Sequence, residues 1–333
     1  MKPSIGVVVP TTGDRPDQLR AAVEAVLAQA YDGELDVVVV VDGADERKVA
    51  HDLADVLAPA DVSADAAMGE VFSAGRRVAT GVLVPAPVQT SRPRVRVLPN
   101  RLSPGLPGSR NTGISACATE FIAFCDDDDL WLPGKLAAQV KQLVLSGAEF
   151  ASCAIEVAYG KRRVSRLAGT DTVTQDDLSR SRMVMVHSST FLFRRGTLWA
   201  DESAPGGQNE DWDLALRAAK RQPIVHVDRP LVRVTWGASH YATRWADRIA
   251  GLEWMLARHP ELAVDPRGAA RIYGQLAFHH AALGQRREAA RWARRTLTTR
   301  PGEPRGPLAL AVAAGLVPAR TVLSLLHGRG RGI

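Results

Sequence analysis

Two short acidic segments are the parts of this sequence best suited to chemistry. Asp126–Asp129 is a run of four aspartates directly after the apolar segment 121–125, and Glu210 and Asp211 follow the pair Gly206-Gly207. Consecutive carboxylates repel one another and cannot help to form a core. Clustered oxygen ligands suit Mg²⁺ or Mn²⁺ holding a phosphate-bearing substrate. A carboxylate brought to a helix start by a glycine loop suits a general base.

Each segment also has an ordinary structural explanation. The aspartate run could be a solvated turn in which Asp129 caps the next helix, although four carboxylates exceed what a cap needs. Asp211 could simply complement the dipole of the helix that it begins. For Asp211 the residues alone leave both explanations open.

The elements that must position these carboxylates indicate an α/β domain with a mostly parallel sheet and some antiparallel structure. A strand at 5–9, an amphipathic helix through Leu27 and a strand at 37–41 predict a right-handed βαβ unit. The carboxyl ends of parallel strands are where such sheets bind ligands. Further strands are expected at 95–98, 121–125, 150–158, 183–187, 191–194 and 224–234, and further helices at 110–117, 133–145 and 212–220.

The rest of the chain differs in pattern. Residues 58–93, rich in Ala, Pro and Gly, indicate an insertion. From Trp245 onward the pattern is helical throughout, and one tetratricopeptide-like hairpin is expected near 268–301. We therefore predict a catalytic domain over 1–244 and a basic helical extension over 245–333.

Composition excludes several classes of protein. The chain has 333 residues, 46% of them hydrophobic and 23% charged, which argues against global disorder. The net charge of +6 is uneven, because residues 266–333 hold 12 arginines, no lysine and two glutamates, leaving −4 for the remainder. Solvated helix faces explain such a tail, and so would contact with an anionic partner. No module for binding nucleic acid is recognisable.

The cysteines and the apolar runs indicate where in the cell the protein is expected. Three cysteines without a C-x-x-C pair argue against a disulfide framework or a zinc knuckle. The apolar runs are too short for a signal peptide or a spanning helix. We predict a cytoplasmic protein with peripheral contact at the inner face of the membrane through the basic tail.

Taken in order, these pieces resemble the family 2 glycosyltransferases. That resemblance implies the GT-A fold, a Rossmann-like sheet for nucleotide-diphospho-sugars flanked by helices. It covers roughly residues 4–240, in the family's order and spacing. The matching segments are IGVVVPTTGDR (5–15), VVVVVDGAD (37–45), LPN with PGSRNTG (98–113), EFIAFCDDDDLWLPGKL (120–136), GGQNEDWDLALR (206–217) and WGASH (236–240).

The resemblance also implies a donor site. Pro10, Thr11 and Asp42 would hold the nucleoside of a nucleotide sugar, which by family frequency is UDP-linked. Arg110 and Asn111 would lie over the nucleotide or the diphosphate. The D-x-D motif falls on 126–128, where Asp126 and Asp127 belong to the donor side, although Asp127 has no assigned role. Asp128, with His240, would bind the divalent metal.

The resemblance further implies an inverting transfer. Asp211 would be the general base that takes the proton of an acceptor hydroxyl, and Glu210 is the other candidate. The acceptor is left open among glycans, lipid-linked glycans, peptides and small molecules. The departure at Val41–Ala44, which holds one aspartate fewer than the usual D-D-G-S, weakens the prediction for nucleobase recognition.

Two rival functions remain for this sequence. A sugar-phosphate nucleotidyltransferase would need a glycine-rich phosphate loop after the first strand, and the segment 11–15 offers only one glycine. A non-catalytic scaffold on a transferase fold would not need both Asp128 and Asp211. We therefore expect an enzyme.

Overall fold

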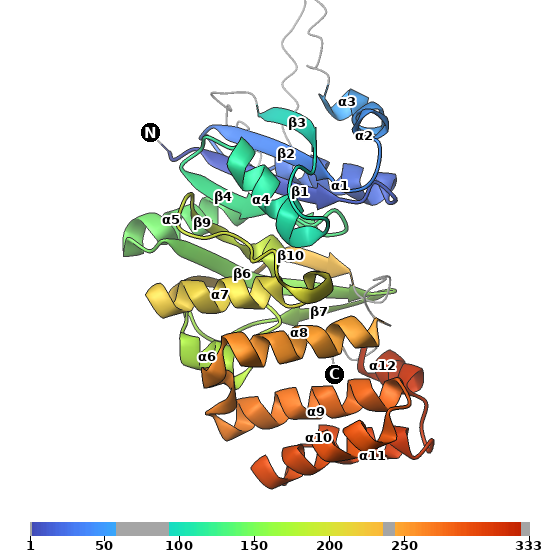
Figure 1. The fold of residues 1–333 in the computed structure, drawn as a ribbon. Helices are drawn as coiled ribbons and strands as arrows, with labels where there is room; N and C mark the ends of the chain where they lie inside the picture. Colours follow the sequence, from blue (N-terminus) through green and yellow to red (C-terminus); the bar gives the residue numbers. More distant parts are fainter. Residues whose placement is uncertain (1, 58–92, 236–243, 328–333) are drawn as a thin grey trace, which may run out of the picture.

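The computed structural model describes residues 2–57, 93–235 and 244–327, which form a mixed α/β body and a stack of helices (Figure 1). The described strands join in one ten-stranded sheet in the order β3-β2-β1-β4-β9-β6-β10-β5, with β7 paired to β6 and β8 to β10. The strands are β1 (Ile5–Thr11), β2 (Leu35–Val41), β3 (Arg94–Pro99), β4 (Phe121–Phe124), β5 (Leu130–Trp131), β6 (Phe150–Tyr159), β7 (Arg162–Arg166), β8 (Thr172–Val173), β9 (Leu192–Arg194) and β10 (Ile224–Thr235).

The first four strands of that order are parallel, as predicted. In β1 and β2 the register pairs Val7 with Val37 and Thr11 with Val41. β9 then pairs antiparallel with both β4 and β6, which joins the two halves of the sheet. Because β1, β2 and β4 end at the same edge, Thr11, Asp42 and Asp126 emerge beside one another.

Helices cover both faces of the sheet, and alternate strand residues point to opposite faces. Val7 and Val9 share an apolar cluster with Leu19 of α1, whereas Val8 shares another with Ile114 of α4. The helices are α1 (Pro16–Leu27), α2 (Glu46–Asp52), α3 (Ala54–Leu57), α4 (Leu106–Ala116), α5 (Lys135–Ser146), α6 (Gln175–Arg180), α7 (Glu210–Arg221), α8 (Trp245–Arg258), α9 (Pro266–Ala282), α10 (Arg286–Thr299), α11 (Arg305–Ala313) and α12 (Ala319–His327), with short 3₁₀ turns at Ser188–Thr190, Pro205–Gly207 and Pro260–Ala263.

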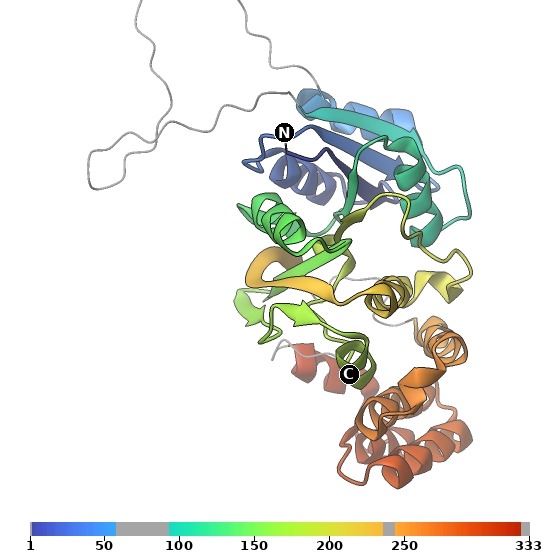
Figure 2. The ribbon, with the colours of Figure 1, turned by 90° about the vertical axis from the view of Figure 1, so that its left-hand side faces the viewer.

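The C-terminal helices pack against the body rather than standing apart (Figures 1 and 2). Leu252 of α8 and Leu276 of α9 belong to the same apolar cluster as Trp212 and Leu214 of α7. α9 and α10 form the expected helical hairpin, turned at Gly284 with a φ of 74°. The division into domains at residues 244 and 245 stays a prediction.

One predicted strand is wrong. Residues 183–187 form turns rather than a strand, since Met183 has a left-handed φ of 49° and the His187 side chain accepts a hydrogen bond from the Ser189 backbone N–H at the start of the next 3₁₀ turn. The insertion at 58–93 lies almost wholly outside the described residues. The three cysteines are free, and all three are buried. Among the described helices, none is long and apolar enough to span a membrane.

Candidate active site

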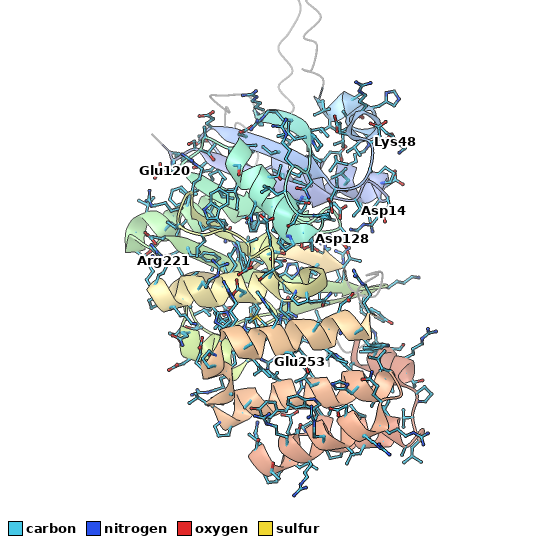
Figure 3. All side chains as sticks on the ribbon, in the orientation of Figure 1. Asp14, Lys48, Glu120, Asp128, Arg221 and Glu253 are labelled. Carbon is cyan, nitrogen blue, oxygen red and sulfur yellow. The ribbon has the colours of Figure 1, made fainter. Side chains whose placement is uncertain are left out.

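A cavity of about 820 Å³ lies where the carboxyl ends of the parallel strands meet the first turn of α7 and the C-terminal helices. All four aspartates of the 126–129 run line it, and so do Glu210 and Asp211. Figure 3 shows Asp128 well inside the outline of the molecule, whereas Lys48 and Glu120 lie at its rim. The fold therefore brings both acidic segments to one cavity, although they are far apart in the chain.

The aspartate run is not a solvated turn. Asp127 and Asp129 are each only 2% exposed. Thr11 Oγ1 donates to Asp127 Oδ2 at 2.6 Å, and Arg15 pairs with both Asp127 and Asp128 at 2.6 Å. Burial raises the pKa of Asp127 to about 6, although the Thr11 hydrogen bond and Arg15 oppose that rise. The end of β1 is thereby tied to the run.

Asp42 lies on the same edge and is already engaged by the protein. Its carboxylate accepts from Asn100 Nδ2 at 2.9 Å and from the Gly105 backbone N–H at 2.7 Å. Gly105 has a φ of 106°, a conformation that favours glycine, and it directly precedes α4. Asp42 therefore holds the loop that leads into α4, while also lining the cavity next to Pro10.

Arg110 connects the two acidic segments. It is 1% exposed, its Nη2 lies 2.7 Å from Asp126 Oδ1, and its Nη1 pairs with Glu210. Its guanidinium also stacks over the Phe124 ring, 5.2 Å from the centroid. Asp126 accepts a second hydrogen bond from Ser188 Oγ at 2.8 Å. Since a buried charge needs partners, this cluster sets how β4, α4 and α7 meet.

The helix that carries Glu210 and Asp211 is entered through three left-handed residues. Gly206, Gly207 and Asn209 have φ values of 57°, 69° and 63°. This turn places both carboxylates in the first turn of α7, facing the cavity. The glycine pair noted in the sequence is thus needed for the backbone itself.

Glu210 and Asp211 differ in their surroundings. Burial raises the pKa of Glu210 to about 7, and its Oε2 is buried with no hydrogen-bond partner among the described residues. Burial alone would raise the pKa of Asp211 as well, but Arg182, His187 and Arg110 outweigh that effect and lower it. Arg182 Nη2 lies 3.0 and 3.2 Å from the two Asp211 oxygens.

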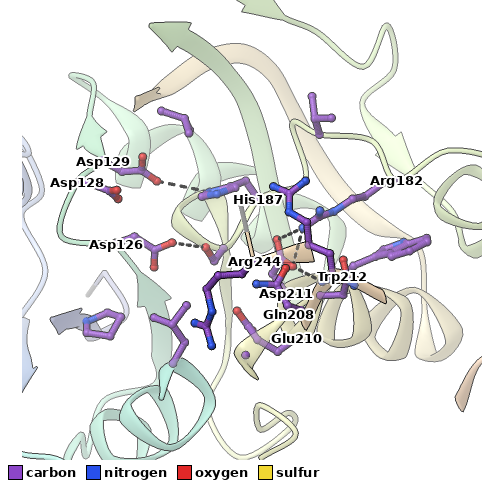
Figure 4. A pocket seen from close by; sticks show the side chains of 18 of the residues that line it. Asp126, Asp128, Asp129, Arg182, His187, Gln208, Glu210, Asp211, Trp212 and Arg244 are labelled. Carbon is purple, nitrogen blue, oxygen red and sulfur yellow. Dashed lines mark hydrogen bonds and ion pairs between the residues drawn. The ribbon is translucent and has the colours of Figure 1, made fainter. Parts of the chain in front are cut away.

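His187 is a cavity residue that the sequence reasoning missed. Its Nδ1 lies 3.5 Å from Asp129 Oδ2, which is buried and accepts no hydrogen bond from any described residue. One ligand atom each from Asp126, Asp129 and His187 lie within 4.8 Å of one another (Figure 4). The two carboxylate oxygens suit Mn²⁺ or Mg²⁺, and the imidazole nitrogen beside them favours the transition metal Mn²⁺. The only sequence signal was a lone histidine ending a wrongly predicted strand.

Two of the predicted ligand positions differ from expectation. Asn111 is not among the residues that line the cavity, and its place over a nucleotide stays a prediction. Its side chain instead bonds Glu202 and both backbone groups of Ala200, because it points to the other side of α4. The predicted metal ligand Asp128 lines the cavity but is held by Arg15. His240 lies outside the described residues.

The chain is similar to known glycosyltransferases. Residues 84–200 match the family model described as "Glycosyl transferase family 2". The Escherichia coli protein "UDP-Glc:alpha-D-GlcNAc-diphosphoundecaprenol beta-1,3-glucosyltransferase WfgD" is 27% identical over 137 residues, 41% of this chain and 53% of WfgD. The chain thus spans about half the length of that curated relative.

Solved structures show the same fold. S. aureus TarS 1–349 in complex with UDP-GlcNAc matches with a TM-score of 0.53 at 13% identity, covering 98% of this chain and 92% of that one. The Pyrobaculum calidifontis mannosyltransferase PcManGT, in complex with GDP-Man and Mn²⁺, matches with a TM-score of 0.50 at 18% identity, covering 97% and 83%. A longer S. aureus TarS chain is matched over only 53% of its length.

The curled, mostly parallel sheet with flanking helices and a cavity at its strand ends is similar to the GT-A fold of the solved glycosyltransferases. With the sequence match over 84–200, the chain is similar in sequence and in fold to the family 2 glycosyltransferases.

Proposed function

We propose that this chain transfers a sugar from a UDP-sugar to a hydroxyl group of an acceptor, with inversion at the anomeric carbon. The observation that carries the proposal is the shared cavity, in which the aspartate run and Asp211 are joined through Arg110 and Glu210. UDP is favoured over other nucleotides because the names of WfgD and of the TarS complex both include a UDP-sugar. PcManGT, solved with GDP-Man, makes GDP the second candidate.

The nucleoside end of the donor would lie over the ends of β1 and β2. Pro10 and Thr11 line the cavity there, and Asp42 offers carboxylate oxygens that can accept from a ring N–H of the base. Arg110 and Asp126 lie further in, toward the diphosphate. Asp127, tied to Thr11 and Arg15, would support this end by holding β1 in place.

A divalent ion fits the end of the cavity that holds the aspartate run. Asp126, Asp129 and His187 have the right donor atoms, and the buried Asp129 Oδ2 lacks a partner among the described residues. This set is favoured over Asp128, whose carboxylate is held by Arg15. An ion held there would supply positive charge against the leaving diphosphate.

Asp211 is proposed as the general base. Its lowered pKa keeps the carboxylate ionised at neutral pH, ready to accept a proton. The acceptor oxygen attacks the anomeric carbon while its proton passes to Asp211. The bond from that carbon to the diphosphate oxygen breaks on the opposite side, so one displacement inverts the configuration. Glu210 is the second candidate, because its pKa of about 7 and partnerless Oε2 also suit a base.

Arg182 must release Asp211 for this step. It donates to both carboxylate oxygens, which otherwise would receive the acceptor hydroxyl. Its side chain is 39% exposed, so moving it costs far less than moving a buried arginine. Arrival of the acceptor would therefore replace the ion pair with a hydrogen bond from the hydroxyl group.

The acceptor is proposed to be lipid-linked, by analogy with the diphosphoundecaprenol substrate in the name of WfgD. Peripheral contact with the membrane would then be made by α10, whose arginines lie on an exposed face. The exposed arginines of α10 are Arg286, Arg287, Arg291, Arg294 and Arg295, and the exposed Arg300 directly follows the helix.

Calorimetric titration of the chain with UDP, GDP, dTDP and CDP, each with Mn²⁺ and with EDTA, tests the donor proposal. We expect metal-dependent binding of UDP. Binding of a different nucleotide would reassign the donor. A folded chain that binds no nucleotide under either condition would contradict the proposed function.

A further inference from the structure

The cavity continues past Asp211 into a wall of arginines supplied by the C-terminal helices. Arg248 of α8, Arg271 of α9 and Arg305 of α11 line it together with Arg182. Arg182 forms an ion pair with Asp211. Arg305 forms an ion pair with Glu303 at 2.6 Å. Arg271 has no ion-pair partner among the residues that the structure describes.

The guanidinium of Arg271 is fixed in position by stacking, and its charge is not paired with a carboxylate of the described residues. Its guanidinium stacks on the Trp212 ring, 5.2 Å from the centroid, and Trp212 directly follows Asp211 in α7. Its Nε and Nη2 are buried and make no hydrogen bond to any described residue. Burial, helped by Arg305 and Arg182, lowers its pKa to about 9. A stacked guanidinium keeps its N–H edge available for a planar or tetrahedral anion.

This wall lies on the opposite side of the site from the donor end. Figure 4 shows Asp126, Asp128 and Asp129 to one side of His187, and Arg182, Asp211 and Trp212 to the other. Because Arg271 stacks on Trp212, an anion bound to it would lie on the Trp212 side of His187, away from the labelled aspartates. It belongs to the acceptor rather than to the donor diphosphate.

We propose that Arg271, with Arg248 and Arg182, forms a phosphate subsite that binds the phosphate or diphosphate group of the acceptor beside Asp211. This inference rests on the proposed function and names the acceptor class, a phosphorylated one. The phosphate draws Arg182 toward itself, and Asp211 becomes available to the hydroxyl group. Two sources share this chemistry, an isoprenoid diphosphate and a polyol phosphate.

Titration with inorganic phosphate in EDTA tests the subsite directly. We expect Arg271→Gln to weaken phosphate binding about tenfold to a hundredfold, the range for a hydrogen bond between charged groups. Arg267→Gln is the matched control, because it removes the same charge from an exposed position of the same helix, and phosphate affinity should stay within about twofold. If Arg271→Gln does not fold, Arg248→Gln takes its place with the same expectation.

Further arms separate the outcomes. Farnesyl diphosphate and glycerol phosphate are titrated in the same way. The compound that binds more tightly to the wild type, and whose affinity falls in Arg271→Gln, identifies the source of the phosphate group. Equal phosphate binding by wild type and Arg271→Gln, or displacement of phosphate by UDP with Mg²⁺, would overturn the subsite. Failure of the wild-type chain to bind UDP would instead count against the proposed function, while UDP binding without phosphate binding counts against the subsite alone.

Discussion

Arg110 of α4 forms a buried ion pair with Glu210, 100 residues further along the chain, and its other nitrogen binds Asp126. One side chain thus joins the end of β4 to the start of α7. Because the charges are removed from water, they stabilise this arrangement only when all of them are present. Geometry at the site and stability of the fold are therefore coupled through this residue.

Arg110→Met should destabilise the protein by about 3–5 kcal/mol, since it leaves Glu210 and Asp126 buried without their cation. Urea unfolding at pH 7 measures this. Arg217→Met is a suitable control, because Arg258 and His259 still pair with Asp213 after Arg217 is removed. If Arg110→Met lowers the free energy of unfolding no more than the control does, the cluster contributes little to stability.

Asp211→Asn should leave UDP affinity within about twofold and reduce kcat by about 10²–10⁴-fold, the contribution of a positioned base. Steady-state transfer assays, combined with nucleotide titration, check both parts. Glu210→Gln is the companion variant. A large kcat loss in Glu210→Gln with full turnover in Asp211→Asn would exchange the two roles.

His187→Ala should weaken Mn²⁺-dependent UDP binding about tenfold or more, the effect expected when a metal ligand is lost. Asp128→Ala should have the smaller effect, because Arg15 already holds that carboxylate. Titrations with Mn²⁺ and with EDTA compare the two. A loss confined to Asp128→Ala would return the ion to the position predicted from the D-x-D motif.

Ionised Asp213 should stabilise the fold, and this stabilisation should be lost at acid pH. Burial would raise its pKa, but His259, Arg217 and Arg258 outweigh this and lower it to about 2. Since the folded pKa lies below the unfolded value of about 3.9, the stabilisation is present above about pH 4 and is lost as the pH falls toward 2. It amounts to about 2–3 kcal/mol.

The difference in unfolding free energy between wild type and Asp213→Asn, measured by urea at pH 7, 4 and 3, isolates this effect from other carboxylates. We expect the difference to shrink as the pH falls. A difference that stays constant from pH 7 to 3 would show that the ionisation of Asp213 is not what stabilises the fold.

Gly113→Ala should cost about 1–3 kcal/mol, because a Cβ at this position would lie 2.2 Å from Val8 Cγ1 in the fully buried face of β1. The close approach of α4 to β1 depends on this glycine. Gly302→Ala is the control, since nothing lies within 4 Å of its would-be Cβ. Thermal unfolding compares them, and equal midpoints for the two variants would contradict this account of the packing.

Local sequence patterns predicted much of the body. Short, unbroken runs of valine such as 37–41 favour buried strands, and the glycine pair before Glu210 indicated the turn into α7. The wrong strand at 183–187 shows the limit of such patterns. Three of its apolar residues line the cavity from turns that are closed by local hydrogen bonds, such as the one from the Val186 N–H to the Met183 carbonyl, whereas His187 also contacts the distant Asp129.

The sequence by itself determined the order of the elements, the family resemblance and the two acidic segments, since these depend on residue type and local spacing. Only the tertiary structure decided which side chains meet. It turned Asn111 away from the cavity, brought His187 to Asp129, and placed Arg271 of α9 over Trp212. The reason is physical: burial, ion pairing and stacking join residues far apart in the chain, and their energies depend on that three-dimensional packing.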